Sequence, residues 1–150
     1  MTADDRYDVS GLPEAQFEPG SHGLVLKNLL RITSKQVMDE VEARALEQAM
    51  DALVRTCGET HRFTATDLCA WHRAWLGDIY EWAGHYRLVN VSKDGFPFAA
   101  AAQVPALMDQ FERDVLRRCT PCRFTSRAEV VHALAEMHVE LVLIHPFRDG

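Results

Sequence analysis

The sequence has no long apolar run, and none of its segments reaches the roughly 18 consecutive apolar residues that a membrane-spanning helix needs. Its start is also unlike a secretory signal peptide, because residues 1–5 are polar and acidic where such a peptide is basic and then apolar. These two absences predict a protein that has no membrane partner and is cytoplasmic.

Positive charge is in short supply. The 16 Lys and Arg residues are outnumbered by 22 Asp and Glu residues, which gives a formal net charge of -6 at pH 7. One basic cluster is interrupted by acidic residues, which favours a solvated face over a binding surface. Its members are Arg113, Arg117, Arg118 and Arg123. Because nucleic-acid-binding domains usually carry a basic stripe or patch, the sequence predicts no nucleic-acid partner.

Cysteine is sparse as well, with four residues in a chain of 150. Two of them form a Cys-x-x-Cys pattern, Cys119-Thr120-Pro121-Cys122, but no strand-like segment precedes it as in redox motifs of the thioredoxin type. Reduced, structural thiols are therefore expected here rather than a redox or zinc site.

Helical patterns occupy much of the chain. Three residue pairs have the spacing of a capping box and mark helix starts: Thr33 with Gln36, Thr64 with Asp67, and Ser126 with Glu129. The second of these helices is expected to continue past Ile79 and to be closed by Gly84. A further helix, with Pro105 in its first turn, is expected over residues 104–116.

The last helical segment, Val130 to Ile144, is apolar on nearly every side, which predicts a central, buried helix. Three of its polar residues, His132, Glu136 and Glu140, share one face because they are spaced four apart. They fit either a metal site or ordinary helix-surface polarity, and we favour the second.

Two further segments do not have helical patterns. Glycine and proline punctuate residues 1–25, which predicts an irregular N-terminal arm ahead of one domain over residues 26–150. Between Leu88 and Phe98, short β-prone pieces flank Lys93-Asp94-Gly95, where the Asp-Gly pair favours a hairpin turn. Such a hairpin would offer an exposed strand edge.

The most informative segment is His145-Pro146-Phe147-Arg148-Asp149-Gly150, directly after the last helical pattern. Proline ends a helix, so His145 lies at or just past the helix end, where an imidazole with a near-neutral pKa can act as a base. Asp149 can hold a hard cation, and Gly150 lets backbone N–H groups turn toward an anion. The combination predicts phosphate chemistry.

This hexapeptide resembles the opening of the signature loop of the Fic family, which reads His-x-Phe-x-Asp/Glu-Gly-Asn-Gly-Arg. Earlier blocks are similar to segments of the same family in order and spacing. They are an entry segment at 26–33, with Arg31 where Gly is usual, a central segment at 71–87 and a flap at 89–98.

The resemblance implies a mainly α fold, the Fic-type helical domain with a short β-hairpin flap. It also implies an enzyme that moves AMP from ATP to a Ser, Thr or Tyr hydroxyl of a protein substrate, with ATP and Mg²⁺ as cofactors. In these terms His145 deprotonates the target hydroxyl, Phe147 anchors the loop, Asp149 holds the metal, and Gly150 begins the phosphate nest.

The flap would bind the target, because in the family a substrate segment pairs with its edge by strand addition. Its candidate contacts are Val89, Val91, Ser92, Lys93 and Phe98. The alternative is that these residues only close over the core.

A larger departure from the family lies in the loop: the sequence carries no counterpart of the Asn-Gly-Arg half of the loop or of the helices that follow it. It therefore predicts an incomplete Fic domain with the final helices missing and a poor catalyst. Two alternatives stay open. One is a non-catalytic remnant that binds a protein partner, and the other is a Doc-like kinase that transfers phosphate.

Many members of the family are restrained by a helix with a Ser/Thr-x-x-x-Glu-Gly/Asn motif. Ser10 and Glu14 have that spacing, but Ala15 stands where Gly or Asn is expected, so we interpret the match as chance. Restraint is then expected from a separate antitoxin protein or from a C-terminal helix outside this sequence.

Overall fold

The computed structural model of the chain describes residues 10–150. Helices dominate it, and a single short hairpin is the one sheet in the described part. The elements are the 3-10 helix η1 (Pro13–Ala15), α1 (Lys35–Thr56), α2 (Ala65–Leu76), β1 (Ser92–Lys93), β2 (Phe96–Pro97), the 3-10 helix η2 (Ala101–Gln103), α3 (Val104–Phe111), the π-helical segment η3 (Glu112–Leu116), α4 (Arg117–Cys119) and α5 (Arg127–Ile144). The mainly helical class with a short hairpin is confirmed.

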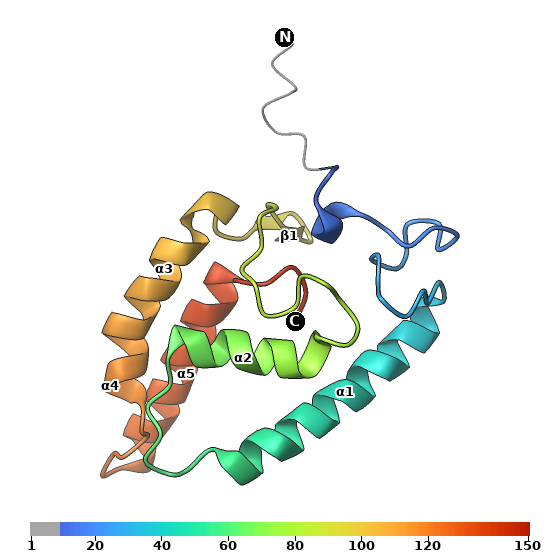
Figure 1. The fold of residues 1–150 in the computed structure, drawn as a ribbon. Helices are drawn as coiled ribbons and strands as arrows, with labels where there is room; N and C mark the ends of the chain where they lie inside the picture. The colour runs from blue at the N-terminus through green and yellow to red at the C-terminus, as the bar shows by residue number, and fades with distance from the viewer. Residues whose placement is uncertain (1–9) are drawn as a thin grey trace.

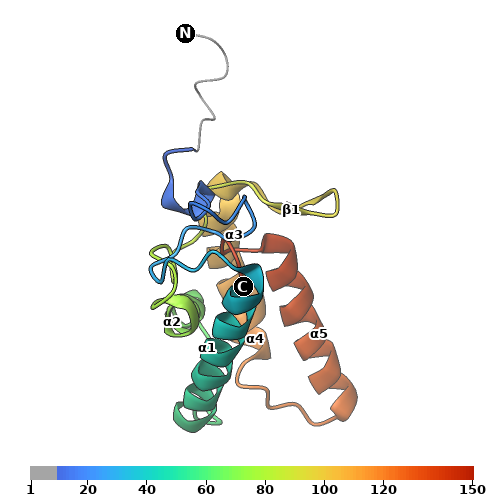
Figure 2. The same ribbon diagram turned by 90° about the vertical axis from the view of Figure 1, so that its right-hand side faces the viewer.

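Helix α2 crosses the middle of the domain, with α1 on one side and α3 and α4 on the other (Figure 1). In Figure 2 the hairpin extends from the body of the domain above the C-terminal end of α5. One core cluster joins the start of α2 to α3, η3 and α5, and includes Val104, Met108 and Ile144. A second joins α1 to the end of α2 and the turns after it, and includes Met38 and Leu76.

Residues 10–25 of the predicted arm consist of turns and the short helix η1, and Phe17 and Leu26 form an isolated antiparallel bridge. Residues 1–9 of that arm lie outside the described residues. The division into an arm and one domain stays a prediction.

Capping residues set where the helices begin. The boxes at Thr64 with Asp67 and at Ser126 with Glu129 are both formed, as predicted. The box at Thr33 is wrong, because Ser34 is the N-cap of α1 and its hydroxyl accepts the N–H of Val37. Thr33 and Ser34 are adjacent hydroxyl residues that are both favourable at the N-cap position, so the sequence alone does not show which of them caps the helix.

The second helix is shorter than predicted. It ends at Leu76, and Gly77 caps it. The carbonyl of Leu76 accepts the N–H groups of Ile79 and Tyr80, so the chain leaves the helix through turns. Gly84 lies in these turns at φ +83°, a conformation that glycine adopts without strain. Its N–H donates to the ring of His72, so the turns fold back onto α2.

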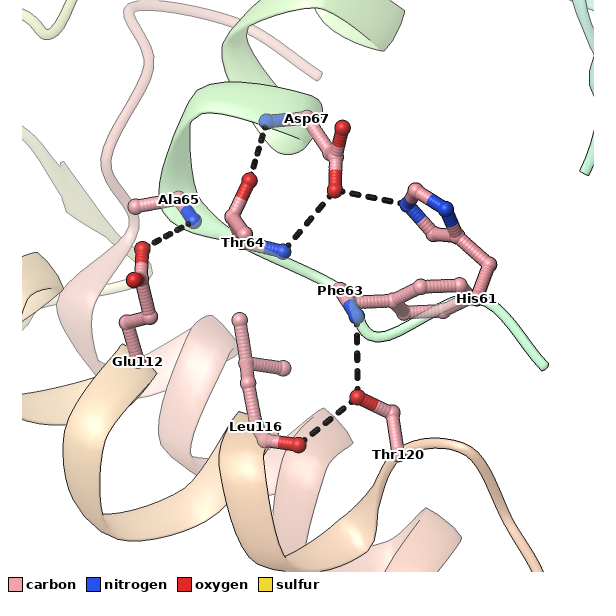
Figure 3. Close-up of polar contacts among 8 residues, drawn as sticks. All are labelled: His61, Phe63, Thr64, Ala65, Asp67, Glu112, Leu116 and Thr120. Carbon is pink, nitrogen blue, oxygen red and sulfur yellow. Dashed lines mark hydrogen bonds and ion pairs between the residues drawn. The ribbon is translucent and has the colours of Figure 1, made fainter.

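The helix predicted over residues 104–116 extends to Cys119 but is not regular, because η3 interrupts it as a π-helical segment. Such segments are rare and occur mostly as single turns inside α-helices. Here the Glu112 carboxylate accepts the N–H of Ala65 at 2.8 Å, one of the donors that an α-helix leaves unpaired at its start (Figure 3).

A second contact ties α2 to the same helix. Thr120 accepts the N–H of Phe63 at 2.9 Å and donates its hydroxyl to the Leu116 carbonyl at 2.7 Å (Figure 3). Asp67 completes the network, since its carboxylate binds the His61 ring and the N–H of Thr64. Helix α2 is thus held at its N-terminal end, and this fixes the face that it turns toward the C-terminal loop.

The prediction that Val130 to Ile144 is a buried central helix is wrong. Only Ala133 and Ile144 of α5 are buried. The exposed apolar side chains on this helix are Val131, Leu134, Val139, Val142 and Leu143. Apolarity on all sides shows that a helix can be buried, but it does not show which neighbours will cover it. In the described structure the main neighbours of α5 are α3, η3 and α4, and they leave much of its apolar surface exposed. Within residues 10–150, no helix is both long and apolar enough to cross a membrane.

Polar residues of the predicted helix face and of the basic cluster form ion pairs with each other or with nearby acidic residues. Glu136 of the predicted helix face binds Arg118, and Arg117 lies 3.8 Å from Glu112. No cluster of three or more metal-ligating side chains occurs in the described residues. Cys119 is buried and Cys122 exposed, and both are free thiols.

Candidate active site

His145 forms the C-cap of α5 in the left-handed conformation, with φ +48° and ψ +68°. Its N–H donates to the Leu141 carbonyl at 2.9 Å, and Pro146 then prevents the helix from continuing. For a residue with a Cβ atom this conformation costs about 1–2 kcal/mol. Its imidazole is half-buried and stacks on the ring of Phe98, with centroids 4.3 Å apart and planes 14° apart.

The surroundings of His145 favour its neutral form. Burial lowers the pKa of the imidazole, and the positive charges of Arg87, Arg148 and Lys93 lower it further, whereas Asp149 opposes them. The ring therefore has a free lone pair at neutral pH, as a general base requires.

Arg87 lies directly behind His145 and is almost completely buried, at 1% exposed. Its guanidinium donates to the carbonyls of Ile144 and His145 at 3.1 and 2.6 Å and to those of Val89 and Ala99 in the flap. Burial lowers the pKa of this guanidinium, partly offset by the Glu14 carboxylate. Sequence patterns predicted no role for Arg87 beyond its place in the central segment, and its position directly before apolar Leu88 and Val89 is the one local signal of burial.

His72 supports the other side of the loop. Its ring stacks on Phe147, with centroids 3.9 Å apart, and its Nδ1 accepts the N–H of Gly84 at 2.9 Å. The proton is therefore on Nε2, which donates to the Asp149 carbonyl at 2.8 Å. Burial lowers the pKa of His72, although the Asp149 carbonyl opposes this. His72 thus has a structural role, and Phe147 points inward and is 7% exposed.

Asp149 and Gly150 lie next to each other at the surface of the loop. The Asp149 carboxylate is exposed and accepts the N–H of Gly150 at 3.0 Å through one oxygen, which leaves the other free. Gly150 has φ +97°, and a Cβ there would lie 2.7 Å from Trp75 Cζ3, so only glycine fits this approach. A single carboxylate fits Mg²⁺, which is usually held by one or two carboxylates and by substrate phosphates.

The predicted flap is the hairpin of β1 and β2, with Ser92 opposite Pro97 and Lys93 opposite Phe96. Its five predicted contact residues differ in exposure. The Val89 side chain is buried, and Phe98 is partly covered by its stack on His145. Val91 is half-buried, whereas Ser92 and Lys93 are exposed.

Two hollows flank the loop. A larger one of about 470 Å³ lies between α1, α2 and α5 and reaches His145, Phe147 and Gly150. A smaller one of about 320 Å³ lies at the base of the flap, lined by Val89 to Ser92 and Arg148. The loop is therefore accessible from both sides, and the structure brings together the loop residues, His72, Arg87 and Phe98.

Comparison with known proteins identifies the family of this arrangement. The sequence model of the Fic/DOC family matches residues 62–150. The chain belongs to the Fic/DOC family. It is 31% identical over 150 residues to the protein adenylyltransferase VbhT of Bartonella schoenbuchensis, which covers 97% of this chain and 29% of VbhT.

Solved Fic domains have the same fold. The N-terminal Fic domain of a Bartonella effector protein from Bartonella sp. AR 15-3 superposes with a TM-score of 0.73 at 23% identity, over 89% of this chain and 64% of that one. BepC from Bartonella tribocorum, solved with bound AMPPNP, has a TM-score of 0.67 at 23% identity, over 83% and 66% of the two chains. The chain thus spans less than a third of VbhT and about two thirds of these solved chains.

Proposed function

We propose that this Fic domain transfers AMP from ATP to a hydroxyl group of a target protein. The observation that carries the proposal is the neutral, half-buried His145, held at the end of α5 beside Asp149. The name of VbhT as a protein adenylyltransferase and the AMPPNP bound to BepC support the same reaction class.

In this reaction His145 accepts the proton of the Ser, Thr or Tyr hydroxyl, which is otherwise a weak nucleophile at neutral pH. Asp149 would hold Mg²⁺, and Gly150 would direct its backbone toward the phosphates. When bound, Mg²⁺ supplies charge neutralisation at the phosphate oxygens. Phe147 and His72 keep the loop seated on α2 through their stacked rings.

The flap would align the target by strand addition. The exposed side chains of Ser92 and Lys93 in β1 support this role. Phe98, which follows β2, stacks on the His145 imidazole and so connects the hairpin to the proposed base. Val89 would contribute indirectly, since its carbonyl is bound by Arg87 and its side chain is buried.

Regulation by a separate antitoxin protein belongs to the same proposal. The Glu14 carboxylate is buried and accepts the N–H of Leu88 at 2.9 Å, so it supports the base of the flap. This engagement favours a structural role for Glu14 over that of an inhibitory glutamate. The free thiols fit a reducing compartment, and we propose that the reaction takes place in the cytoplasm.

The experiment uses ATP labelled at either the α- or the γ-phosphate, mixed with the chain and a bacterial lysate. Transfer of the α label supports AMP transfer. Transfer of the γ label alone would indicate a Doc-like kinase. If neither label is transferred, even by a version extended through Asn-Gly-Arg, the domain is a non-catalytic binding module. The 150 residues supply few hydrogen-bond donors for the nucleotide phosphates. We therefore expect slow transfer by the chain itself and faster transfer by the extended version.

Variants of the extended version separate the two loop residues. His145→Ala should lower transfer by about 10² to 10⁴ and leave ATP·Mg²⁺ affinity nearly unchanged, because the imidazole acts on the incoming hydroxyl. Asp149→Ala should weaken calorimetric ATP·Mg²⁺ binding as well. His132→Ala, at an exposed histidine of the same helix, is the control. Equal loss of ATP affinity in the two loop variants would contradict the role of His145.

A further inference from the structure

Arg87 is a fully buried cation that has no ion-pair partner in the described residues. Its hydrogen bonds go to backbone carbonyls instead. The guanidinium donates to Ile144 and His145 on one side, and to Val89 and Ala99 on the other. A buried charge is tolerated only when its donors are satisfied, and these four carbonyls accept hydrogen bonds from all three guanidinium nitrogens.

The first pair of carbonyls belongs to the end of α5. An α-helix leaves its last carbonyls without an intrahelical partner and has a negative partial charge there, so a cation at this end is favourable. The backbone N–H of Arg87 adds a contact to the Pro146 carbonyl at 2.9 Å. Arg87 therefore binds the carbonyls of three successive residues, 144 to 146.

These contacts determine the orientation of His145. The peptide planes before and after its Cα atom carry the carbonyls of Ile144 and His145, and Arg87 holds both. Fixing two consecutive peptide planes fixes φ and ψ between them. The Arg87 side chain thus holds the left-handed backbone of His145, and this backbone directs the imidazole toward Phe98.

The second pair of carbonyls belongs to the flap. Val89 comes before the hairpin and Ala99 after it, so the guanidinium binds both ends of the segment that we propose to hold the target. Because the guanidinium is planar and rigid, its donors have fixed relative directions. The flap and the helix end are therefore held by one rigid group.

We propose that Arg87 is a positioning residue, which sets the His145 imidazole and the flap in one fixed relative geometry. The inference rests on the proposed function only in taking His145 as the base. Lysine cannot replace Arg87 in this role, since an ammonium group donates from a single point and cannot span carbonyls on two sides.

The charge and the geometry of Arg87 have separable effects on His145. The charged groups that influence this imidazole are Arg87, Arg148 and Lys93, which disfavour its protonation, and Asp149, which favours it. Arg87→Lys keeps a positive charge but loses the planar donor set. Arg87→Met loses both at similar volume.

NMR spectroscopy of the 150-residue chain tests the proposal. In the wild type, the His145 ring protons should be shifted upfield by the Phe98 ring. In both Arg87→Lys and Arg87→Met that shift should be lost. The pKa of His145 should rise further in Arg87→Met, because that variant loses the positive charge as well as the burial of the ring. The ring protons of the exposed His132 should keep the same chemical shifts in all three proteins. An unchanged His145 shift in a folded Arg87 variant would overturn the proposal.

A measurement on the wild type covers the case in which neither variant folds. The Arg87 Nε–H donates to the His145 carbonyl at 2.6 Å, so this proton should exchange slowly with solvent. Fast exchange would overturn the proposal. Since neither experiment uses nucleotide or target, a failure of AMP transfer would leave both outcomes unaffected and would count only against the proposed function.

Discussion

The imidazole of His72 lies flat on the ring of Phe147, with centroids 3.9 Å and planes 12° apart. The two residues are 75 positions apart in the sequence. One comes from the middle of α2 and the other from the loop after α5, so this contact attaches the loop to α2. The same histidine donates to the Asp149 carbonyl, and stacking and hydrogen bonding therefore hold the loop together.

Phe147→Ala should be strongly destabilising. Deleting a buried phenylalanine leaves a cavity and typically costs about 3–5 kcal/mol in the free energy of unfolding. Phe96→Ala is the control, because Phe96 is 52% exposed in the hairpin and its loss should change stability by about 0.5 kcal/mol or less. Urea unfolding of the three proteins measures both differences. Equal stability of the two variants would show that Phe147 does not anchor the loop.

Stability should depend on pH through His72. Burial lowers the pKa of this imidazole below its ordinary value of 6.5, so the unfolded chain binds more protons than the folded one just below that pH. The free energy of unfolding should therefore be at its full value above pH 6.5 and fall as the pH is lowered through it. His145, whose pKa is also lowered, contributes with the same sign.

The pH dependence can be assigned with one variant. Urea unfolding at a series of pH values between about 5 and 7.5 covers the range in which histidines titrate. Comparison with a variant removes the contribution of groups that both proteins share, such as Glu42, whose pKa is raised by burial. His72→Gln should have a smaller slope of stability against pH than the wild type. The same slope in both proteins would mean that another group is responsible.

Gly84→Ala should destabilise the domain, whereas Gly58→Ala should not. At Gly84 the backbone has φ +83°, and a Cβ would lie 2.7 Å from that of Arg73 and 3.1 Å from the Cys69 carbonyl. Strain of this kind exceeds the roughly 0.4–1 kcal/mol that alanine gains over glycine at a compatible site. At Gly58 no atom lies within 4 Å of the position that a Cβ would take, and φ is not in the left-handed region. Alanine should therefore be neutral or mildly stabilising there.

Thermal unfolding compares the two glycine variants. A second readout for Gly84→Ala is the His72 ring, because a shifted Gly84 would withdraw the N–H that binds Nδ1. The expected result is a rise in the pKa of His72 toward its ordinary value. A Gly84→Ala protein as stable as the wild type would contradict the geometry of this turn.

The apolar surface of α5 should promote association of the 150-residue chain. Five large apolar side chains on this helix are between 44% and 56% exposed, which is an unusual concentration for a monomer surface. Light scattering should detect oligomers or aggregates, and the double variant Leu134→Lys, Val139→Lys should reduce them. A monodisperse wild-type monomer with a cooperative thermal transition would contradict this prediction.

Local sequence signals predicted much of the fold. The capping boxes at Thr64 and Ser126, the Asp94-Gly95 turn and the helix end at His145 depend on a few neighbouring residues, so they can be read without the tertiary structure. The motif blocks identified the family, and the family model that matches residues 62–150 confirms it.

Non-local contacts could not be predicted in the same way. The exposure of α5 depends on which helices pack against it, and the contact of Glu112 with Ala65 joins residues 47 positions apart in the sequence. At the site, Arg87 acts through carbonyl groups, and every residue has a carbonyl. No side-chain pattern in the sequence therefore marks its partners.

With His145 as the base that we propose, its left-handed backbone sets fold stability against chemistry at a single position. Glycine would relieve the backbone strain there, and asparagine would tolerate the conformation better than most residues, but neither could serve as the base. A protein that no longer uses the imidazole could thus lose the backbone strain at this position, whereas an active one must retain it. On the proposed role, glycine or asparagine at the position of His145 in a relative would mark a protein that no longer uses this imidazole.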